Sequence, residues 1–395
     1  MRPSENLPQL LDFYEAELLD RVMPWWMNSG FLDREYGGIL QTMADDGTVG
    51  SEDKFMWSQG RGLYLFSALY NRIGPRYEWL AVANRVFEFL LPIGREQRWC
   101  WPGWVHRDGS IKAPSANIYA DGFAIMGMTE YARATGDERA VEAALATYET
   151  VRERMKVPGP HLDVPAALPQ DNAKTHGISM IFSTVFHELG KLVDDAEILQ
   201  AGYDHALQIM DHFCKPQRRL ILEHVVLDGS EFDTPEGRHV NPGHGIESMW
   251  FLIHMFRDRG QRARIEQAAE RLRWQMEACW DAEYGGMFTI LDADGNAPSP
   301  EELKAMWPHN EADYALLLAY EQTREQWCLD WYDRVHEWTF RYFPMPEYGE
   351  WRYRVERDGS VPEPARADPY CRSHDPFHLP RALLWCIDVL QRIVA

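Results

Sequence analysis

The sequence predicts an all-α protein, and more closely an (α/α)6 barrel of twelve helices with short β-hairpins in the links between helix pairs. Three observations lead to this prediction. Apolar residues recur at helical spacing in twelve segments, short connections join neighbouring helices, and the longer links resemble one another. No change of composition and no low-complexity linker divides the chain, so residues 1–395 are expected to form one domain.

The amphipathic pattern places the helices in twelve segments that form six successive pairs. In chain order these segments are 7–27, 57–73, 76–93, 118–135, 138–157, 176–193, 196–214, 244–259, 262–280, 308–322, 325–343 and 376–393. Very short connections favour antiparallel packing of neighbours, and they occur at Gly74-Pro75, Gly136-Asp137, Asp194-Asp195 and Gly260-Gln261.

The longer links carry a repeated pattern that ends in Asp-Gly. Residues 33–39 read Asp-Arg-Glu-Tyr-Gly-Gly-Ile and run on to Asp46-Gly47, and residues 281–288 repeat this pattern before Asp294-Gly295. Looser copies end at Asp108-Gly109, Asp228-Gly229 and Asp358-Gly359. Aromatic or β-branched runs closed by Asp-Gly are typical of hairpins, so short strands are expected here. An open solenoid is the competing arrangement, but the irregular repeat favours a closed ring.

Composition and charge exclude several classes of protein. The chain has 395 residues, 45% of them apolar and 13% aromatic, and its 61 acidic and 40 basic residues give a net charge of -21. Such a field repels phosphates, which argues against nucleic-acid or anionic-membrane partners and favours a small-molecule ligand. The first eight residues lack the apolar core of a signal peptide, and no run of about 18 apolar residues follows. These features predict a cytoplasmic protein.

Cysteine usage predicts neither a disulfide framework nor a zinc site. The six cysteines show no Cys-x-x-Cys pair and no regular spacing, which is expected of reduced, mostly buried thiols. They are Cys100, Cys214, Cys279, Cys328, Cys371 and Cys386.

Polar and aromatic residues collect at the starts of alternate helices, which a closed ring would bring to one rim. One such residue alone is more often a cap, a core residue or a counter-ion, but their recurrence at equivalent positions favours a pocket for a polar small molecule. The candidates are Arg61, Tyr119, His176, His244, Glu247, Trp250, Trp307, Glu311, His378 and Arg381.

Residues 241–250 are the most informative of these helix starts. Asn241-Pro242-Gly243 interrupts the preceding segment, and His244 and Glu247 then lie three residues apart on one face of a first helical turn. A histidine and a carboxylate at the positive end of a helix suggest proton transfer, although a satisfied helix cap is the simpler alternative.

From about residue 10 to the C-terminus the motifs resemble those of the N-acylglucosamine 2-epimerase family. The resemblance rests on residues 54–61, 241–247 with Trp250, 307–312, 347–351 and 377–382. It implies an (α/α)6 barrel that interconverts sugars at C2 without a redox cofactor or a catalytic metal. It also implies that His244 and His378 are an acid/base pair, which would deprotonate and reprotonate C2 of the ring-opened sugar through an enediolate.

The resemblance assigns roles to the other candidates as well. Arg61 would stabilise the negative oxygen of the enediolate, while Glu247 and Glu311 would orient the histidines and bind sugar hydroxyls. Tyr119, Trp250 and Trp307 would shape the pocket, and Arg381 would support the wall near His378. ATP is an expected activator in this branch of the family, although the sequence contains no P-loop. The aromatic-rich helical surface is compatible with a homodimer.

The substrate is less sharply specified than the reaction. Relatives that act on mannose or cellobiose carry an Asn-x-x-Met-His pattern, whereas residues 177–181 here read Gly-Ile-Ser-Met-Ile and lack that histidine. His176, just upstream, could partly replace it. The difference favours N-acylglucosamine and N-acylmannosamine as substrates, with mannose, glucose or cellobiose as the alternative. Two alternatives belong to other functional classes: a glycoside hydrolase that uses Glu247 and Glu311, and a non-catalytic sugar-binding protein.

Overall fold

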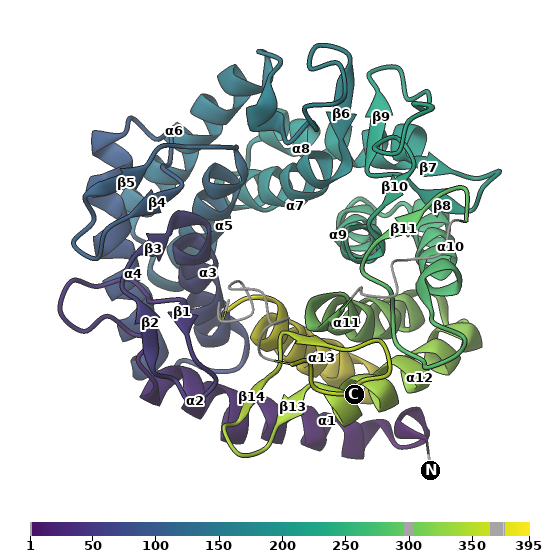
Figure 1. The fold of residues 1–395 in the computed structure, drawn as a ribbon. Helices are drawn as coiled ribbons and strands as arrows, with labels where there is room; N and C mark the ends of the chain where they lie inside the picture. The colour runs from purple at the N-terminus through teal and green to yellow at the C-terminus, as the bar shows by residue number, and fades with distance from the viewer. Residues whose placement is uncertain (1, 296–302, 364–373, 375) are drawn as a thin grey trace.

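The chain winds into a closed ring of inner and outer helices, seen end-on in Figure 1. The computed structural model describes residues 2–295, 303–363, 374 and 376–395. Within these residues the inner ring consists of α3 (Met56–Arg72), α5 (Tyr119–Thr135), α7 (His176–Val193), α9 (Pro242–Asp258), α11 (Met306–Thr323) and α13 (His378–Val394). The outer helices are α4 (Tyr77–Glu96), α6 (Glu138–Met155), α8 (Ala196–Gln208), α10 (Arg262–Cys279) and α12 (Gln326–Tyr342). The (α/α)6 prediction is therefore confirmed.

The outermost layer is completed by the N-terminal segment. α1 (Leu7–Ala16) continues through a π-helical stretch (Glu17–Val22) into α2 (Met23–Asn28), and together they correspond to the expected helix over 7–27. This segment packs against α13, at the opposite end of the sequence, and α13 also contacts α3. The expectation of six successive pairs is wrong for one pair, because a ring can close only if the two ends of the chain form the sixth hairpin.

Burial follows the position of each helix in the ring. α11 is buried almost all round from Met306 to Ala319, since neighbours cover every side of it. α6 instead buries one stripe, at residues 140, 143, 144, 147, 148 and 151, and presents its other side to solvent. The inner helices therefore form the core and can expose side chains only at their two ends.

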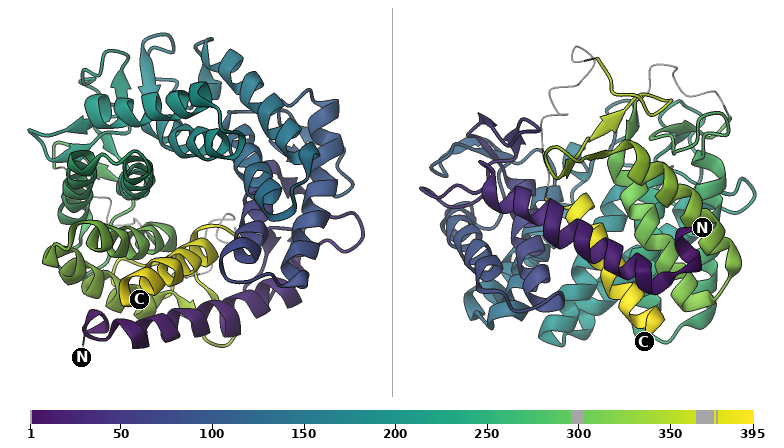
Figure 2. Two further views of the ribbon diagram at one scale, coloured as in Figure 1. Left: turned by 180° about the vertical axis from the view of Figure 1, so that it is seen from behind. Right: turned by 90° about the horizontal axis from the view of Figure 1, so that it is seen from below.

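The links at the N-terminal ends of the inner helices contain short strands, which Figure 2 (right) shows gathered at one end of the barrel. Local hairpins are formed by β1 (Thr42–Met43) with β2 (Val49–Ser51), β4 (Trp104–Val105) with β5 (Ile111–Ala113), β7 (Cys214–Lys215) with β8 (Leu220–Ile221), and β13 (Pro344–Met345) with β14 (Glu350–Trp351). The first two surround Asp-Gly pairs, as predicted.

Other strands pair between different links, which the sequence did not predict. β3 (Lys54–Phe55) pairs with β4, β6 (Ala173–Thr175) with β9 (His224–Val226), β10 (His239–Val240) with β11 (Leu291–Asp292), and β12 (Lys304–Ala305) with β15 (Arg354–Val355). The Asp-Gly pairs at 228–229, 294–295 and 358–359 are thus turns after cross-link strands, not the tips of isolated hairpins. The glycines in all five pairs have φ between 80° and 92°, which glycine adopts without steric penalty.

A buried lysine ties each copy of the Asp-x-Glu-Tyr-Gly-Gly link to the next hairpin. The Lys54 ammonium lies 2.9 Å from the Asp33 carboxylate and donates to the carbonyls of Gly37 and Arg107, each at 2.7 Å. Arg107 also donates to Asp33. The matching set in the second copy is Lys304, Asp281, Gly285 and Arg357. The repeated pattern therefore has a structural role, which is to hold the rim together.

The expectation of free, mostly buried cysteines agrees with the described residues. Cys371 lies outside them, and the other five form no disulfide among themselves, with Cys214, Cys279, Cys328 and Cys386 buried. Over the same described ranges, no helix has the length and apolar character needed to cross a membrane.

Candidate active site

The candidate residues lie where the inner helices begin, at the rim that carries the strands. α9 starts at this rim because the Asn241 side chain accepts a hydrogen bond from the His244 backbone N–H at 3.2 Å, with Pro242 in the first turn. Gly243 is needed here for space, since a Cβ atom would lie 2.2 Å from the Trp307 ring. The cap therefore sets the position of His244, and the glycine lets Trp307 approach it.

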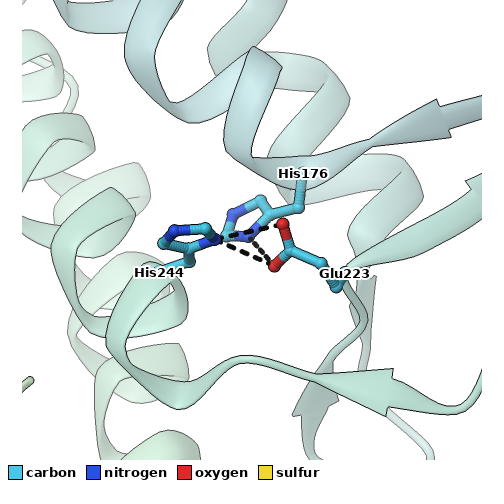
Figure 3. A group of neighbouring side chains, drawn as sticks. All are labelled: His176, Glu223 and His244. Atoms are coloured by element: carbon cyan, nitrogen blue, oxygen red, sulfur yellow. Dashed lines mark hydrogen bonds and ion pairs between the residues drawn. The ribbon is translucent and has the colours of Figure 1, made fainter. Parts of the chain in front are cut away.

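The first cluster, the Glu223 centre, consists of His176, Glu223 and His244 (Figure 3). His244 Nδ1 lies 3.0 Å and 3.1 Å from the two carboxylate oxygens of Glu223, and His176 Nδ1 lies 3.6 Å from one of them. Gly177 N–H donates to Glu223 at 3.2 Å, and His176 Nε2 lies 3.2 Å from Ser248 Oγ. One buried carboxylate thus serves two imidazoles.

The electrostatics of the Glu223 centre favour an ion pair. Burial by itself would raise the pKa of Glu223, but the positive charge of His244 and the hydrogen bond from His176 hold it well below its usual value. Burial would likewise lower the pKa of His244, but the charge of Glu223 outweighs it and the pKa is raised. Since Nδ1 is held by Glu223, Nε2 is the ring nitrogen of His244 that points away from the carboxylate (Figure 3).

The second cluster, the Glu311 centre, consists of Glu247, Trp250, Glu311, His378 and Arg381. His378 Nδ1 lies 2.7 Å from Glu311 Oε1, and the Trp250 indole N–H donates to Glu311 Oε2 at 2.9 Å. One Arg381 nitrogen donates to Glu247 at 2.7 Å and also to Glu311. A fixed guanidinium therefore joins two buried carboxylates, one of which holds His378.

Trp307 contacts both histidines. The centre of its ring lies 5.7 Å from that of His244 and 5.1 Å from that of His378. One indole therefore contacts a histidine of each centre, and each histidine is anchored through Nδ1. Two such groups around one aromatic face can exchange protons with a ligand that lies between them.

Arg61 and Tyr119 occupy the neighbouring part of the rim. The Arg61 guanidinium lies 4.2 Å from the ring centre of Phe123 and 4.4 Å from that of Phe377, which also packs against His378. Tyr119 donates its hydroxyl hydrogen to Asp163 at 3.0 Å. A Cβ atom on Gly177 would lie 2.5 Å from the Tyr119 hydroxyl, so Tyr119 lies directly beside the Glu223 centre.

Sequence reasoning missed Glu223 and Asp163, the acidic partners of His244 and Tyr119. Glu223 stands in a link whose sequence predicts only a strand with an Asp-Gly turn, and Asp163 stands in irregular chain between α6 and β6. Neither residue lies at a helix start. The available signal was a single charged residue, Glu223, between the apolar Leu222 and a strand, where an unpaired charge would be costly to bury.

Both centres place three potential metal ligands within 4.8 Å of one another. In the Glu311 centre Arg381 already supplies the positive charge that a metal would bring, which disfavours a second cation. The two imidazoles and the carboxylate of the Glu223 centre are a donor set that could hold a divalent ion. In the structure Glu223 holds His244 through hydrogen bonds and His176 through an ion pair.

A closed helical barrel with two histidine–carboxylate centres at one mouth defines an acid/base enzyme for a small polar substrate. The N-acylglucosamine 2-epimerase (GlcNAc 2-epimerase) family model matches residues 37–370, and the chain belongs to this family. It is therefore an isomerase, as the motifs predicted.

The comparisons with single proteins agree with this family. The chain is 31% identical over 390 residues to N-acylglucosamine 2-epimerase of Bos taurus, which covers 96% of this chain and 91% of that protein. The structure of cellobiose 2-epimerase from Spirochaeta thermophila DSM 6192 matches with a TM-score of 0.82 at 20% identity, over 98% of each chain. D-mannose isomerase matches with a TM-score of 0.76 at 17% identity, over 96% of this chain and 97% of that one. At these identities the two structures support the fold.

Proposed function

We propose that the protein interconverts N-acyl-D-glucosamine and N-acyl-D-mannosamine by moving the proton at C2. The observation that carries this proposal is the pair of carboxylate-anchored histidines, His244 and His378, which both contact the Trp307 ring. The 31% identity to a 2-epimerase of N-acylglucosamine supports the N-acylated substrate.

In the proposed reaction the sugar is ring-opened and carries a carbonyl at C1. One neutral histidine removes the C2 proton, and the electrons of the C–H bond form an enolate whose negative charge lies on the C1 oxygen; an unacylated sugar, which also carries oxygen at C2, would give the enediolate. The other histidine, protonated at the start, delivers its proton to the opposite face of C2. Atoms and charge balance, since one proton leaves and one returns without a change of oxidation state. The raised pKa of His244 suits the member of the pair that holds the proton at rest.

The negative C1 oxygen of the enolate requires a fixed donor, and we assign this role to Arg61. Loss of such a donor typically lowers kcat by about 10²–10³. Arg61→Ala is therefore expected to lower kcat far more than it changes KM. Steady-state kinetics on both epimers would check this, and an effect confined to KM would contradict the role.

Three other candidates are proposed to act beside the histidines. Glu247 and Glu311 orient His378 and bind sugar hydroxyls, while Tyr119 shapes the pocket. Both ring nitrogens of His176 face protein groups, Ser248 and Glu223, so we assign it the role of supporting Glu223. This proposal differs from the sequence-based expectation that His176 replaces the missing sugar-binding histidine, because neither nitrogen is left for a sugar hydroxyl.

A glycoside hydrolase is a weaker proposal for the same barrel. Such an enzyme needs one carboxylic acid and one carboxylate on opposite sides of the scissile bond. Here Glu247 and Glu311 both contact a single Arg381 nitrogen, which places them side by side. They therefore do not lie on opposite sides of a bond that could be cleaved between them.

Proton NMR in D2O would test the proposal and its main alternative together. Purified protein is incubated separately with N-acetylglucosamine, N-acetylmannosamine, mannose, glucose and cellobiose. Deuterium at C2 with formation of the epimer from only the N-acetyl sugars is the expected result. Exchange with only the unacylated sugars would keep the mechanism and overturn the substrate, whereas release of a smaller sugar from cellobiose would support a hydrolase.

We further propose that the enzyme acts in the cytoplasm as a homodimer, requires no redox cofactor or metal, and is activated by ATP. Dialysis against EDTA is expected to leave the rate unchanged, and added ATP is expected to raise it. Light scattering after size exclusion should give twice the chain mass of 46.0 kDa. A rate that is lost with EDTA and restored by one metal would contradict the metal-free proposal.

A further inference from the structure

A second cavity opens at the other end of the barrel, where the inner helices finish. Figure 2 (left) looks at this end. The cavity has a volume of about 490 Å³ and is lined by side chains from all six inner helices, mostly from their C-terminal halves. Its volume falls in the range of small-molecule sites, and nothing in the proposed reaction uses it.

Six arginine or lysine side chains and four acidic side chains line this cavity. Apart from Arg381, which is held by the Glu311 centre, the basic residues stand in the last turns of their helices, where they complement the negative end of the helix dipole. Four of them also have a carboxylate within 4.0 Å, namely Arg133, Lys191, Arg257 and Arg392. For these four residues, the helix end and the neighbouring carboxylate are enough to explain why a basic side chain stands there.

Arg72, at the end of α3, is different. Within the described part of the chain, no carboxylate oxygen lies within 4.0 Å of its guanidinium, which is stacked over the Trp385 ring at 4.1 Å. Arg72 keeps an exposed side chain while it lines the cavity. Burial would lower its pKa, but the charges of Glu130, Tyr64 and Asp388 raise it. The cavity therefore contains a permanently charged cation that has a stacking partner and no direct ion-pair partner.

The charges of the wall restrict the ligand that could pair with Arg72. Glu130, Glu188 and Asp388 surround the guanidinium, and the helix C-termini add partial negative charge. One added negative charge would complete the pairing, whereas several would be repelled. Aromatic side chains complete the wall, including Phe251 and Trp385, and offer contact to a compact organic body.

We propose that this cavity binds a small organic acid with a single carboxylate, which pairs with Arg72 while the rest of the molecule packs against Phe251 and Trp385. The site is distinct from the proposed sugar site, since the histidines lie at the opposite end of the inner helices. Trp250 and Arg381 line the cavity and also belong to the Glu311 centre, so they form the partition between the two sites.

Isothermal titration calorimetry with sodium benzoate and sodium gluconate would test this site. At least one of the two acids is expected to bind saturably, both alone and with N-acetylglucosamine in excess. Arg72→Gln should weaken that binding about tenfold or more, since it removes a charge-assisted pair. Arg139→Gln, an exposed arginine on α6, should leave the affinity unchanged and serves as the matched control.

Calorimetry measures binding without turnover, so its result is independent of whether the proposed reaction is correct. Met126→Trp fills the cavity from α5 and should abolish binding even if Arg72→Gln proves unstable. The proposal would be overturned by no saturable binding of either acid, by an unchanged affinity in both variants, or by displacement with the sugar. Equal affinity for inorganic phosphate or ATP, with the same dependence on Arg72, would overturn the single-charge ligand class.

Discussion

The Glu223 and Glu311 centres each bury a carboxylate that holds a histidine, but the positive charge that balances the carboxylate differs between them. Both hold a histidine through Nδ1 with a buried carboxylate. Glu223 is balanced by two imidazoles, His176 and His244, whose charge depends on their protons. Glu311 is balanced by Arg381, whose pKa is raised by Glu311 and Glu247 despite its burial, so that its charge is permanent. The charge that balances Glu311 is therefore fixed, whereas the charge that balances Glu223 depends on the proton of His244.

The difference also appears in access to solvent. The His244 side chain is 26% exposed, whereas that of His378 is 12% exposed. The more exposed histidine is thus the one whose carboxylate partner has no fixed counter-ion. An epimerase that runs in both directions must reset the protons of its two bases after each turnover, and the Glu223 centre is the better placed of the two to exchange its proton with water.

Removing each histidine in turn is the strongest test of this comparison. His244→Ala and His378→Ala should each lower epimerisation by about 10²–10⁴ while the fold is retained. The histidine that remains should still exchange the C2 proton of the one epimer whose hydrogen faces it. NMR in D2O, started from each pure epimer, should therefore show exchange of opposite epimers in the two variants. Exchange of the same epimer in both variants would contradict the assignment of each histidine to one face of C2.

The fixed cation should matter more for stability than the titratable partners do. Arg381→Met leaves two carboxylates buried without their counter-ion and should destabilise the fold by about 3–5 kcal/mol. Glu223→Gln should cost less, about 1–3 kcal/mol, because His244, whose pKa is raised by Glu223, can lose its proton when the carboxylate is gone. Urea unfolding at neutral pH measures both free energies. An equal or larger loss in Glu223→Gln would contradict the comparison.

Stability should depend on pH through the Glu223 centre. The lowered pKa of Glu223 contributes stability above its unfolded value of 4.5, which is lost as pH falls through the folded pKa. The raised pKa of His244 contributes stability that is fully present below 6.5 and is lost as pH rises through the folded pKa. The difference in unfolding free energy between the wild type and Glu223→Gln should therefore be largest between these two values. A difference that does not vary with pH would show that the pair is not ionised.

The smallest expected effect concerns Ser248, the outer partner of His176. Its hydroxyl donates to the Gly245 carbonyl at 3.0 Å and lies 3.2 Å from His176 Nε2. Ser248→Ala should destabilise the protein by about 1 kcal/mol and lower kcat less than tenfold, because Glu223 still holds His244. Thermal unfolding and steady-state kinetics would measure these effects. A loss as large as that of His244→Ala would make His176 part of the proton-transfer chemistry.

The helices could be predicted because their signal is local. Apolar spacing placed a helix over 57–73 and another over 176–193, and the structure has them at Met56–Arg72 and His176–Val193. The helix starts could be grouped on one rim because alternate helices in a ring run in the same direction. The motifs also indicated the family, which the family model confirms.

The partners of the site residues could not be predicted in the same way. Glu223 reaches His244 from a link 21 residues upstream, and His378 reaches Glu311 across 67 residues. No periodicity connects such positions, because their distance in space depends on how the ring closes. The pairing of strands between links, and of α1 with α13, has the same origin.

The ring of helices, the family and the residue types at the rim follow from local spacing or from a contiguous motif, so they can be inferred from the amino-acid order alone. The contacts of Glu223 with His244 and of Arg381 with Glu247 and Glu311, and the place of Arg72 in a cavity beside Trp385, arise only when separate helices and links pack together. These facts depend on contacts between separate helices and links, and burial in a closed ring is what gives each contact its electrostatic strength.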